Sequence, residues 1–547
     1  MKNLFYFIVI LVLFSCTSEK QKADLLVKNA KVYTVNSTFE TAEAFVINEG
    51  EIIEIGDSET LETKYTPSNT FDAQGKTIVP GLIDAHAHLY NLGLFLQNVD
   101  LKGTKSYDEV LERVIVFQKE RNLDYIEGRG WDQNDWEVKE FPTKEKLDEL
   151  FPDTPVALKR IDGHAYLVNS KALELAGIHA KTNAKGGEII INNGELTGII
   201  IDSPMDLINE SIPKSSVDYK IQALKEAEKV CLKLGLTTVD DAGLDKEIIE
   251  LIDSLQQSGD LSIRIYAMVS NTKKNLDYYL QKGIIKTNRL HVRSVKVYAD
   301  GALGSRGATL RKEYSDQSGH FGAMITPKDE LDELADRIAK AGFQMNTHAI
   351  GDSANVSVLR AYKNVINDTN DLRWRIEHAQ VVTPLDMDNF SKNIIPSVQP
   401  THATSDMYWA EDRVGAERIN GAYAYKSLLN SAGMVALGTD FPIEKVNPMH
   451  TFYAAVARKD LENYPEEGYR IEEALTREET LKGMTIWAAY SNFEEHEKGS
   501  IEVGKFADFT VLDKDIMIIP EDEIPNVKVS ATFINGEKVF EKGSDLY

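Results

Sequence analysis

The chain has 547 residues, more than one ordinary hydrophobic core accommodates, so several domains are expected. Its 42% hydrophobic and 27% charged residues are typical of a globular protein and exclude a fibrous or disordered one. The formal net charge of −25 argues against a nucleic-acid partner, because there is no basic excess to neutralise phosphates.

The N-terminus has the pattern of a secretory signal peptide, predicted over residues 1–15. Lys2 precedes an apolar run, residues 4–14, that is too short to span a bilayer as a permanent helix. The run ends in Leu13-Phe14-Ser15-Cys16, which resembles the lipobox of bacterial lipoproteins. That resemblance implies a lipid on Cys16, whereas the alternative is an ordinary signal peptide with an incidental cysteine. We expect residues 16–23 to be a polar tether and the protein to be exported, on the periplasmic or cell-surface side, with the lipid as its only membrane anchor.

After the tether, residues 24–77 read as short strands separated by turns, for example residues 44–47 and 52–56. Residues 499–547 show the same β-branched alternation and contain the hairpin turn Asn535-Gly536. Because these two β segments flank a long α/β middle, we predict one discontinuous β-sandwich domain built from both ends of the chain.

The middle, residues 78–498, alternates strands with helical stretches, which is the signature of a parallel sheet in an α/β protein. Eight strands are expected, the number that closes a (β/α)8 barrel of the TIM type. The stretch between the first and second strands is too long for one connection and predicts an inserted subdomain over about residues 104–216. The expected strands are residues 78–88, 236–240, 262–269, 292–300, 343–348, 373–378, 394–399 and 434–440.

The first of these strands ends in His86-Ala87-His88. Side chains alternate between the faces of a strand, so the two imidazoles point the same way and form half of a metal site, although such a pair also arises by chance. Barrel enzymes carry their chemistry at the carboxyl ends of the strands. Those ends are expected to bring together, in a site for zinc or a similar divalent ion, His86, His88, Lys296, His348, His378 and Asp440.

At these residues the chain resembles the amidohydrolase superfamily of metal-dependent hydrolases, and the resemblance spans essentially the whole mature chain. Residues 297–306 (VYADGALGSR) and 347–352 (THAIGD) resemble the subgroup that contains N-substituted formamide deformylase. The resemblance implies one metal ion on His86, His88 and Asp440, and a second on His348 and His378. It also implies that Lys296 bridges the two as a carbamate formed with carbon dioxide; the alternative is an unmodified lysine and a single-metal site.

Such a metal ion lowers the pKa of its bound water to about 7, which supplies hydroxide to attack a carbonyl group. We expect Asp440 to take the proton of that water and pass it to the leaving nitrogen. His164, in the insertion, either hydrogen-bonds the substrate or the tetrahedral intermediate from above the barrel, a catalytic role, or is an ordinary loop histidine.

Four further residues carry weaker predictions. Trp131 either lines a substrate pocket or packs in a core, and Arg306 either meets a substrate carboxylate or forms a structural ion pair. His402 follows the seventh strand, with a similarly open role in substrate binding. Asp300 is expected to orient a metal ligand.

The sequence therefore predicts a metal-dependent amidohydrolase that hydrolyses the non-peptide carbon–nitrogen bond of an amide, N-formyl or N-acyl compound. The same metal site acting on a cyclic amide or an ester remains an alternative, because a fold does not fix a substrate. A third hypothesis is that the protein is a non-catalytic lipoprotein that binds a ligand. The expected partner is a small amide-type molecule, and a homodimer is left open.

Overall fold

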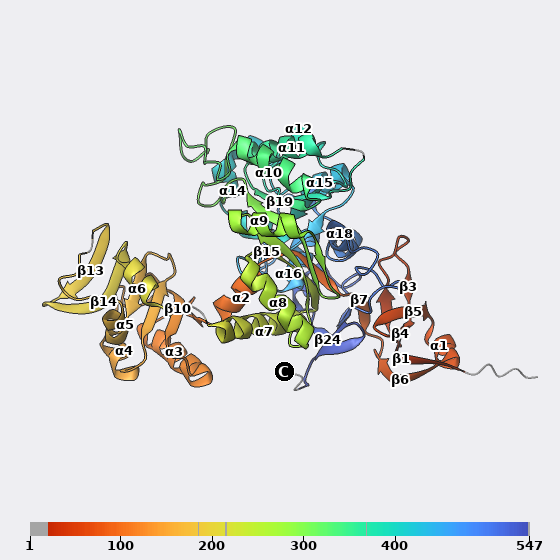
Figure 1. The fold of residues 1–547 in the computed structure, drawn as a ribbon, viewed down its shortest axis with the longest axis horizontal. Helices are drawn as coiled ribbons and strands as arrows, with labels where there is room; N and C mark the ends of the chain where they lie inside the picture. The colour runs from red at the N-terminus through yellow and green to blue at the C-terminus, as the bar shows by residue number, and fades with distance from the viewer. Residues whose placement is uncertain (1–19, 184, 214–215, 368, 545–547) are drawn as a thin grey trace, which may run out of the picture.

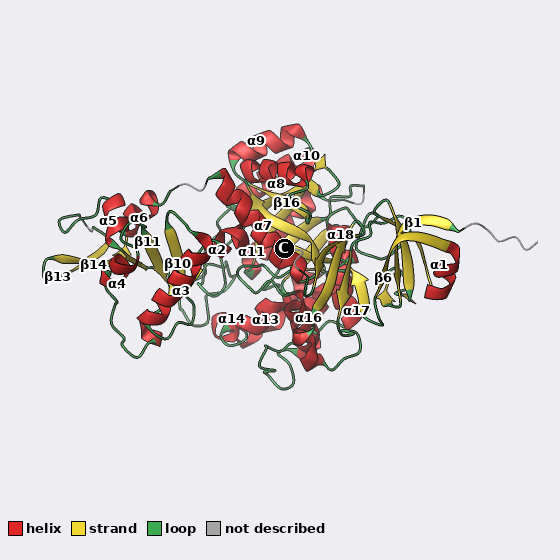
Figure 2. Cartoon of the chain, turned by 90° about the horizontal axis from the view of Figure 1, so that it is seen from below, coloured by secondary structure: helices red, strands yellow, loops and turns green. Residues whose placement is uncertain are grey.

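The computed structural model describes residues 20–544 except residues 184, 214, 215 and 368. The predicted signal peptide and Cys16 lie outside the described residues. Within the described part, none of the helices combines the length and the apolar character needed to cross a membrane. Figure 2 shows three β-rich parts in a row: an inserted domain, a central barrel and a sandwich.

The centre of the molecule is a sheet of eight neighbouring parallel strands, which confirms the predicted (β/α)8 barrel. The sheet is closed beyond β22, where the backbone N–H of Asp440 donates to His86 O at 2.7 Å and that of His88 donates to Phe441 O at 2.9 Å. Both faces of the strands are buried, so apolar residues predominate in them, and polar residues such as Asp240 and Arg375 are buried as well. In barrel order they are β8 (Leu82–Ala87), β15 (Leu236–Leu244), β16 (Arg264–Ser270), β18 (Leu290–Tyr298), β19 (Gln344–Ala349), β20 (Trp374–His378), β21 (Ile394–Val398) and β22 (Ala436–Leu437).

Helices surround the barrel (Figure 1). The apolar face at helical spacing is clear in α10, where Leu331, Leu334, Ala335 and Ile338 are buried against the sheet. The outer helices are α2 (Leu89–Leu96), α7 (Val217–Lys233), α8 (Lys246–Ser258), α9 (Lys273–Lys282), α10 (Lys328–Lys340), α11 (Asp352–Val365), α13 (Pro400–Asp406), α14 (Ala410–Arg418), α15 (Tyr425–Ala432), α16 (Pro448–Ala457), α17 (Arg477–Gly483) and α18 (Ile486–Ser491).

Both ends of the chain form one β sandwich, as predicted. Its defining contact is the antiparallel pairing of β7 with β23, which sets Ile78 opposite Val511. The two sheets pack face to face through Val27, Phe45, Phe509 and Phe533, and the last two rings stack at 4.3 Å. One sheet contains β1 (Gln21–Lys28), β4 (Ala44–Asn48), β5 (Glu51–Gly56) and β6 (Tyr65–Asp72); the other contains β2 (Lys31–Tyr33), β3 (Thr41–Ala42), β7 (Thr77–Pro80), β23 (Phe509–Leu512), β24 (Val529–Ile534) and β25 (Glu537–Glu541).

Two segments differ from expectation at their boundaries. The strand expected over residues 78–88 is two strands, because the chain changes sheets at Gly81: β7 belongs to the sandwich and β8 to the barrel. The backbone passes so close to its neighbour there that a Cβ on Gly81 would lie 2.2 Å from Thr237 Oγ1. Strand β1 begins at Gln21, inside the expected tether, because it pairs in parallel with β6 from that residue onward.

The inserted domain follows β8 and α2 and has its own six-stranded sheet and its own apolar cores. In Figure 1 it stands apart from the barrel, to which α2 and α7 connect it. Arg121 forms an ion pair with Glu226 of α7 across this connection. Its elements are β9 (Val99–Asp100), α3 (Tyr107–Arg121), β10 (Ile126–Trp131), α4 (Glu145–Leu150), β11 (Val156–Arg160), β12 (Ala165–Val168), α5 (Ser170–Leu175), β13 (Gly187–Asn192), β14 (Glu195–Asp202) and α6 (Met205–Ser211).

Candidate metal centre

A cavity of about 390 Å³ opens at the carboxyl ends of the barrel strands. Among the residues that line it are His88, Lys296, His348, His378 and Asp440, and His86 lies buried beside them. All six residues that were expected to form the metal site therefore meet in one place.

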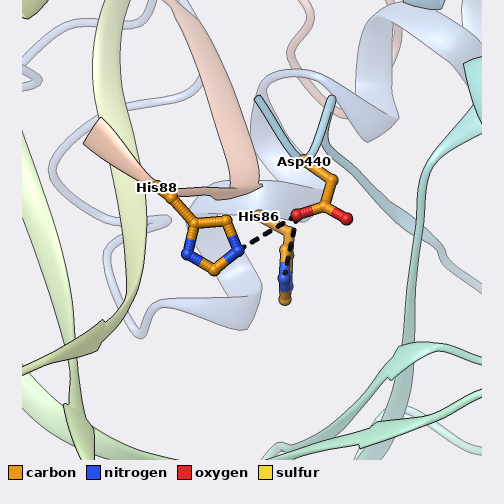
Figure 3. A group of neighbouring side chains, drawn as sticks. All are labelled: His86, His88 and Asp440. Carbon is orange, nitrogen blue, oxygen red and sulfur yellow. Dashed lines mark ion pairs between the residues drawn. The ribbon is translucent and has the colours of Figure 1, made fainter. Parts of the chain in front are cut away.

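His86, His88 and Asp440 form the first half of the cluster (Figure 3). Asp440 Oδ1 lies 3.1 Å from His88 Nε2 and 3.8 Å from His86 Nε2. The other ring nitrogens are occupied: His86 Nδ1 lies 2.5 Å from Glu377 Oε2, and His88 Nδ1 lies 2.9 Å from the carbonyl oxygen of Ala242. These contacts turn both Nε2 atoms toward Asp440, which is how proteins orient histidine ligands.

Lys296, His348 and His378 form the second half. Lys296 Nζ lies 2.9 Å from His86 Nε2, so the lysine reaches the first half directly. The His378 ring lies 4.5 Å from that of His348 and 4.8 Å from that of His86, measured between ring centroids. Gln399 Oε1, 2.8 Å from His378 Nδ1, holds the His378 ring in place.

Two atoms of the cluster are buried without a hydrogen-bond partner in the described part of the chain: His348 Nε2 and Asp440 Oδ1. Leaving such atoms unpaired costs about 1–3 kcal/mol each, so a water molecule or a ligand is expected to pair with them. Imidazole nitrogens and a carboxylate oxygen are the donor set of zinc and similar divalent ions. The residues present therefore fit a divalent metal ion.

Burial sets the protonation of these ligands. It lowers the pKa of His86 to about 4 and that of His348 to about 3, and Lys296 nearby acts in the same direction on both. Burial also lowers the pKa of Lys296 itself, to about 8. The two histidines are consequently neutral at neutral pH, the state in which imidazole binds a metal ion.

A buried ion-pair network lies beneath the histidines and was missed by the sequence reasoning. Arg375 lies between Glu377, whose Oε1 is 2.7 Å from its Nε, and Asp240, whose Oδ2 is 2.6 Å from its Nη1. Glu377 in turn holds His86. The available signal was the alternation of Arg375 and Glu377 in an otherwise apolar strand, because alternate residues share a face.

His402, in α13, contacts the cluster through Asp440. Its Nε2 lies 3.3 Å from Asp440 Oδ2 and its Nδ1 lies 3.2 Å from Glu444 Oε1. Burial alone would lower the pKa of His402, but these two carboxylates outweigh it and raise the pKa to about 10. His402 is thus a cation that holds the Asp440 carboxylate in one orientation.

Asp300 lies next to the cluster and holds the loop after β19. Its carboxylate accepts hydrogen bonds from the backbone N–H groups of Thr309, Ile350 and Gly351. Its Oδ1 is 3.6 Å from His348 Nε2, so Asp300 positions the segment that carries His348.

The structure does not bring the other three predicted residues to the cavity. The His164 side chain is 74% exposed on the inserted domain, where its Nδ1 lies 2.9 Å from Asp202 Oδ1. Trp131 is fully buried in the core of that domain and donates from Nε1 to Leu158 O, as the core-packing alternative expects. Arg306 forms an ion pair with Asp316 and does not line the cavity.

The sequence profile described as the amidohydrolase family matches residues 69–540. The chain is 33% identical to Protein LONG AFTER FAR-RED 3 of Arabidopsis thaliana, over 95% of this chain and 92% of that protein. It is also 33% identical to Putative amidohydrolase YtcJ of Bacillus subtilis, over 93% of this chain and 98% of that protein. Its identity to N-substituted formamide deformylase of Arthrobacter pascens is 27%, over 95% and 99% of the two chains.

A solved structure with the same fold is that of an uncharacterized metal-dependent hydrolase from Pyrococcus horikoshii. It superimposes with a TM-score of 0.76 at 30% sequence identity and covers 91% of this chain and 99% of its own. The similarity therefore includes the sandwich and the inserted domain as well as the barrel.

Proposed function

The chain belongs to the amidohydrolase family and is a metal-dependent hydrolase, and from this premise we propose that it cleaves the non-peptide carbon–nitrogen bond of an amide, N-formyl or N-acyl compound. The observation that carries the proposal is the convergence of four histidines, Lys296 and Asp440 on one cavity, with buried ligand atoms that lack partners. The likeness to N-substituted formamide deformylase, at 27% identity, supports the choice of bond.

We assign two zinc ions to the site. His86, His88 and Asp440 would hold the first, and His348 and His378 the second. The place of Lys296, buried against His86 Nε2, supports its role as a bridging carbamate. A lysine ammonium cannot bind a metal ion, whereas a carboxylated lysine offers two anionic oxygens.

Bound zinc supplies a Lewis acid and a water molecule of lowered pKa. The chain's own contribution to the reaction is proton transfer, which we assign to Asp440. His402 fixes the orientation of this carboxylate through Oδ2, and its other oxygen, Oδ1, receives no hydrogen bond in the described part of the chain. A carboxylate held at the cavity wall is within reach of both the attacking water and the leaving nitrogen.

The exported, lipid-anchored location is also a proposal, supported by the residues around Cys16. Expression in a bacterium with a lipoprotein pathway tests it by cell fractionation. The natural chain is expected in the membrane fraction and Cys16→Ser outside it. Equal release of both proteins would favour an ordinary signal peptide.

The enzymatic proposal is tested by metal analysis followed by a hydrolysis screen on zinc-loaded and chelator-stripped protein. The screen contains N-substituted formamides, N-acyl amines, N-acyl amino acids, lactams and esters. We expect about two zinc ions per chain and zinc-dependent turnover of formamides or N-acyl compounds. Turnover of lactams or esters alone would favour the alternative, in which the enzyme cleaves a cyclic amide or an ester. Zinc-loaded protein inactive on every class would support a ligand-binding protein instead.

A further inference from the structure

Two acidic side chains, Asp406 and Glu444, line the cavity in addition to Asp440. In the described part of the chain, each accepts hydrogen bonds through only one of its two carboxylate oxygens. Asp406 Oδ2 accepts from Gln380 Nε2 at 3.1 Å and from the Tyr423 hydroxyl at 2.8 Å. Asp406 Oδ1 receives no hydrogen bond within the part of the chain that the structure describes.

Glu444 repeats this arrangement on a different segment. Its Oε1 lies 3.2 Å from His402 Nδ1 and accepts from Ser405 Oγ at 2.6 Å, while no described residue donates to Oε2. Each carboxylate thus has one oxygen held by protein donors and a second left for a ligand. Asp440 Oδ1, which is buried and receives no hydrogen bond in the described part of the chain, belongs to the same cavity, so a ligand is expected there.

Three cations at or near the cavity are already paired. His402 lies between Asp440 and Glu444, and two arginines, Arg306 on the loop after β18 and Arg413 in α14, both contact Asp316. Among the described residues that line the cavity, none is an arginine, and the one lysine, Lys296, belongs to the metal cluster. Outside the metal cluster, a substrate carboxylate would therefore find among the lining residues only His402, which is already paired with two carboxylates, and it would face Asp406 and Glu444.

Most of the remaining lining of the cavity is apolar. Leu303, Trp409 and Ile443 belong to it, and Gly304 lies directly against Trp409, because a Cβ on Gly304 would be 3.3 Å from the indole ring. A volume of about 390 Å³ accommodates a small molecule with a short carbon chain. The inserted domain supplies none of the lining residues in this structure.

We propose that the substrate carries a positively charged nitrogen, an ammonium or an amidinium group, which Asp406 and Glu444 bind through their free oxygens while the carbon chain packs against Trp409. This inference rests on the proposed function, because it assumes that the bond to be cleaved lies at the metal cluster. Hydrogen bonds from a cation to a partly buried carboxylate are about twice as strong as neutral ones. The same carboxylates repel a substrate that ends in an anion.

Three acetamides of matched length provide the first test. N-(4-aminobutyl)acetamide ends in an ammonium, N-pentylacetamide in a methyl group and 5-acetamidopentanoate in a carboxylate. With zinc-loaded full-length protein we expect kcat/KM for the ammonium compound to exceed that for the carboxylate compound by about tenfold or more. Equal values, or a preference for the carboxylate, would overturn the proposal.

Asp406→Asn removes one charge and keeps both protein contacts, because the amide oxygen can still accept from Gln380 and Tyr423. We expect the ratio of kcat/KM between the ammonium and the methyl compound to fall by about tenfold. Asp412→Asn is the matched control, since it removes the same charge from an exposed residue on α14 that does not line the cavity. Identical ratios in the two variants would contradict a role for Asp406.

A binding measurement separates this inference from the proposed function. Calorimetry compares propylguanidinium with its neutral isostere propylurea on zinc-loaded protein, and neither compound has an acetamide bond to cleave. We expect the guanidinium to bind about tenfold more tightly to the natural chain and this difference to disappear in Asp406→Asn. If no acetamide is cleaved but the difference is present, the cation site stands and the proposed reaction fails. If the difference is absent, the cation site is wrong whatever is hydrolysed.

Discussion

Asp440 contacts both the histidines of the candidate metal centre and His402. Its Oδ1 faces His86, in β8, and His88, directly after it, and its Oδ2 lies beside His402. The His402–Glu444 contact extends this line of charges to the edge of the cavity. At this scale, one carboxylate is expected both to hold the metal ion and to move the proton.

Asp440→Asn separates these two roles, because the amide keeps the size and an oxygen ligand but cannot act as a base. We expect turnover to fall by about 10²–10⁴-fold while zinc remains bound. Steady-state kinetics and elemental analysis of the same sample measure both quantities. Near-normal turnover in a zinc-loaded variant would refute proton transfer by Asp440.

Lys296→Ala tests the bridge between the two ions. Without the bridging group we expect the zinc content to drop from about two ions per chain to one or fewer, since anionic oxygens that join the halves are lost. Lys273→Ala, at a lysine side chain that is 87% exposed, serves as the control and should keep its zinc. Two ions surviving the loss of Lys296 would exclude the carbamate bridge.

At the scale of elements, β20 joins the barrel core to the metal centre. Its charged side chains alternate with apolar ones, so Arg375 and Glu377 share the face that points into the barrel, where both are fully buried. Arg375 forms ion pairs with both Glu377 and Asp240, and Glu377 holds His86. The strand therefore connects the packed core of the barrel to His86, a proposed metal ligand.

Arg375→Met leaves two carboxylates buried without their cation. We expect the free energy of unfolding to fall by about 3–5 kcal/mol, because an uncompensated buried charge is costly. Arg360→Met is the control: this arginine pairs with Asp332 near the surface, with 46% of its side chain exposed, and such pairs contribute below about 1 kcal/mol. Urea unfolding of both variants measures the difference, and equal losses would mean that the buried network is not what stabilises the barrel.

At the scale of the whole molecule, the parts contribute unequally to the site. The barrel supplies all six expected metal ligands, and the sandwich braces the amino-terminal side of the barrel through Arg264, which lies 2.6 Å from Asp508 of the carboxyl-terminal segment. The inserted domain has separate apolar cores and no residue in the lining of the cavity.

Replacing residues 99–211 by a short glycine–serine linker tests the independence of the barrel. Helices α2 and α7, which carry the two ends, already pack together so closely that a Cβ on Gly93 would lie 2.2 Å from Ala223 O. We expect the shortened protein to fold and to keep its zinc, because all ligands remain. A folded product without zinc, judged by circular dichroism and elemental analysis, would show that the insertion shapes the metal centre.

The sequence by itself determined the eight barrel strands, the split sandwich and the set of metal-site candidates. A run of apolar residues indicates a buried strand without reference to the rest of the chain. In a parallel barrel, the carboxyl ends of all strands lie at the same end of the barrel. Positions such as His348 and His378 could therefore be identified without knowing which residues lie beside them.

Only the tertiary structure decided which polar residues surround those ligands. Glu377 holds His86, His402 contacts Asp440, and Asp406 shares a cavity with Glu444, although each pair comes from different elements. It also placed Trp131 in a separate core and His164 away from the cavity. These positions depend on the paths of the loops at the carboxyl end of the barrel and on the position of the inserted domain. No local pattern encodes such distances, because they result from packing among segments far apart in the chain.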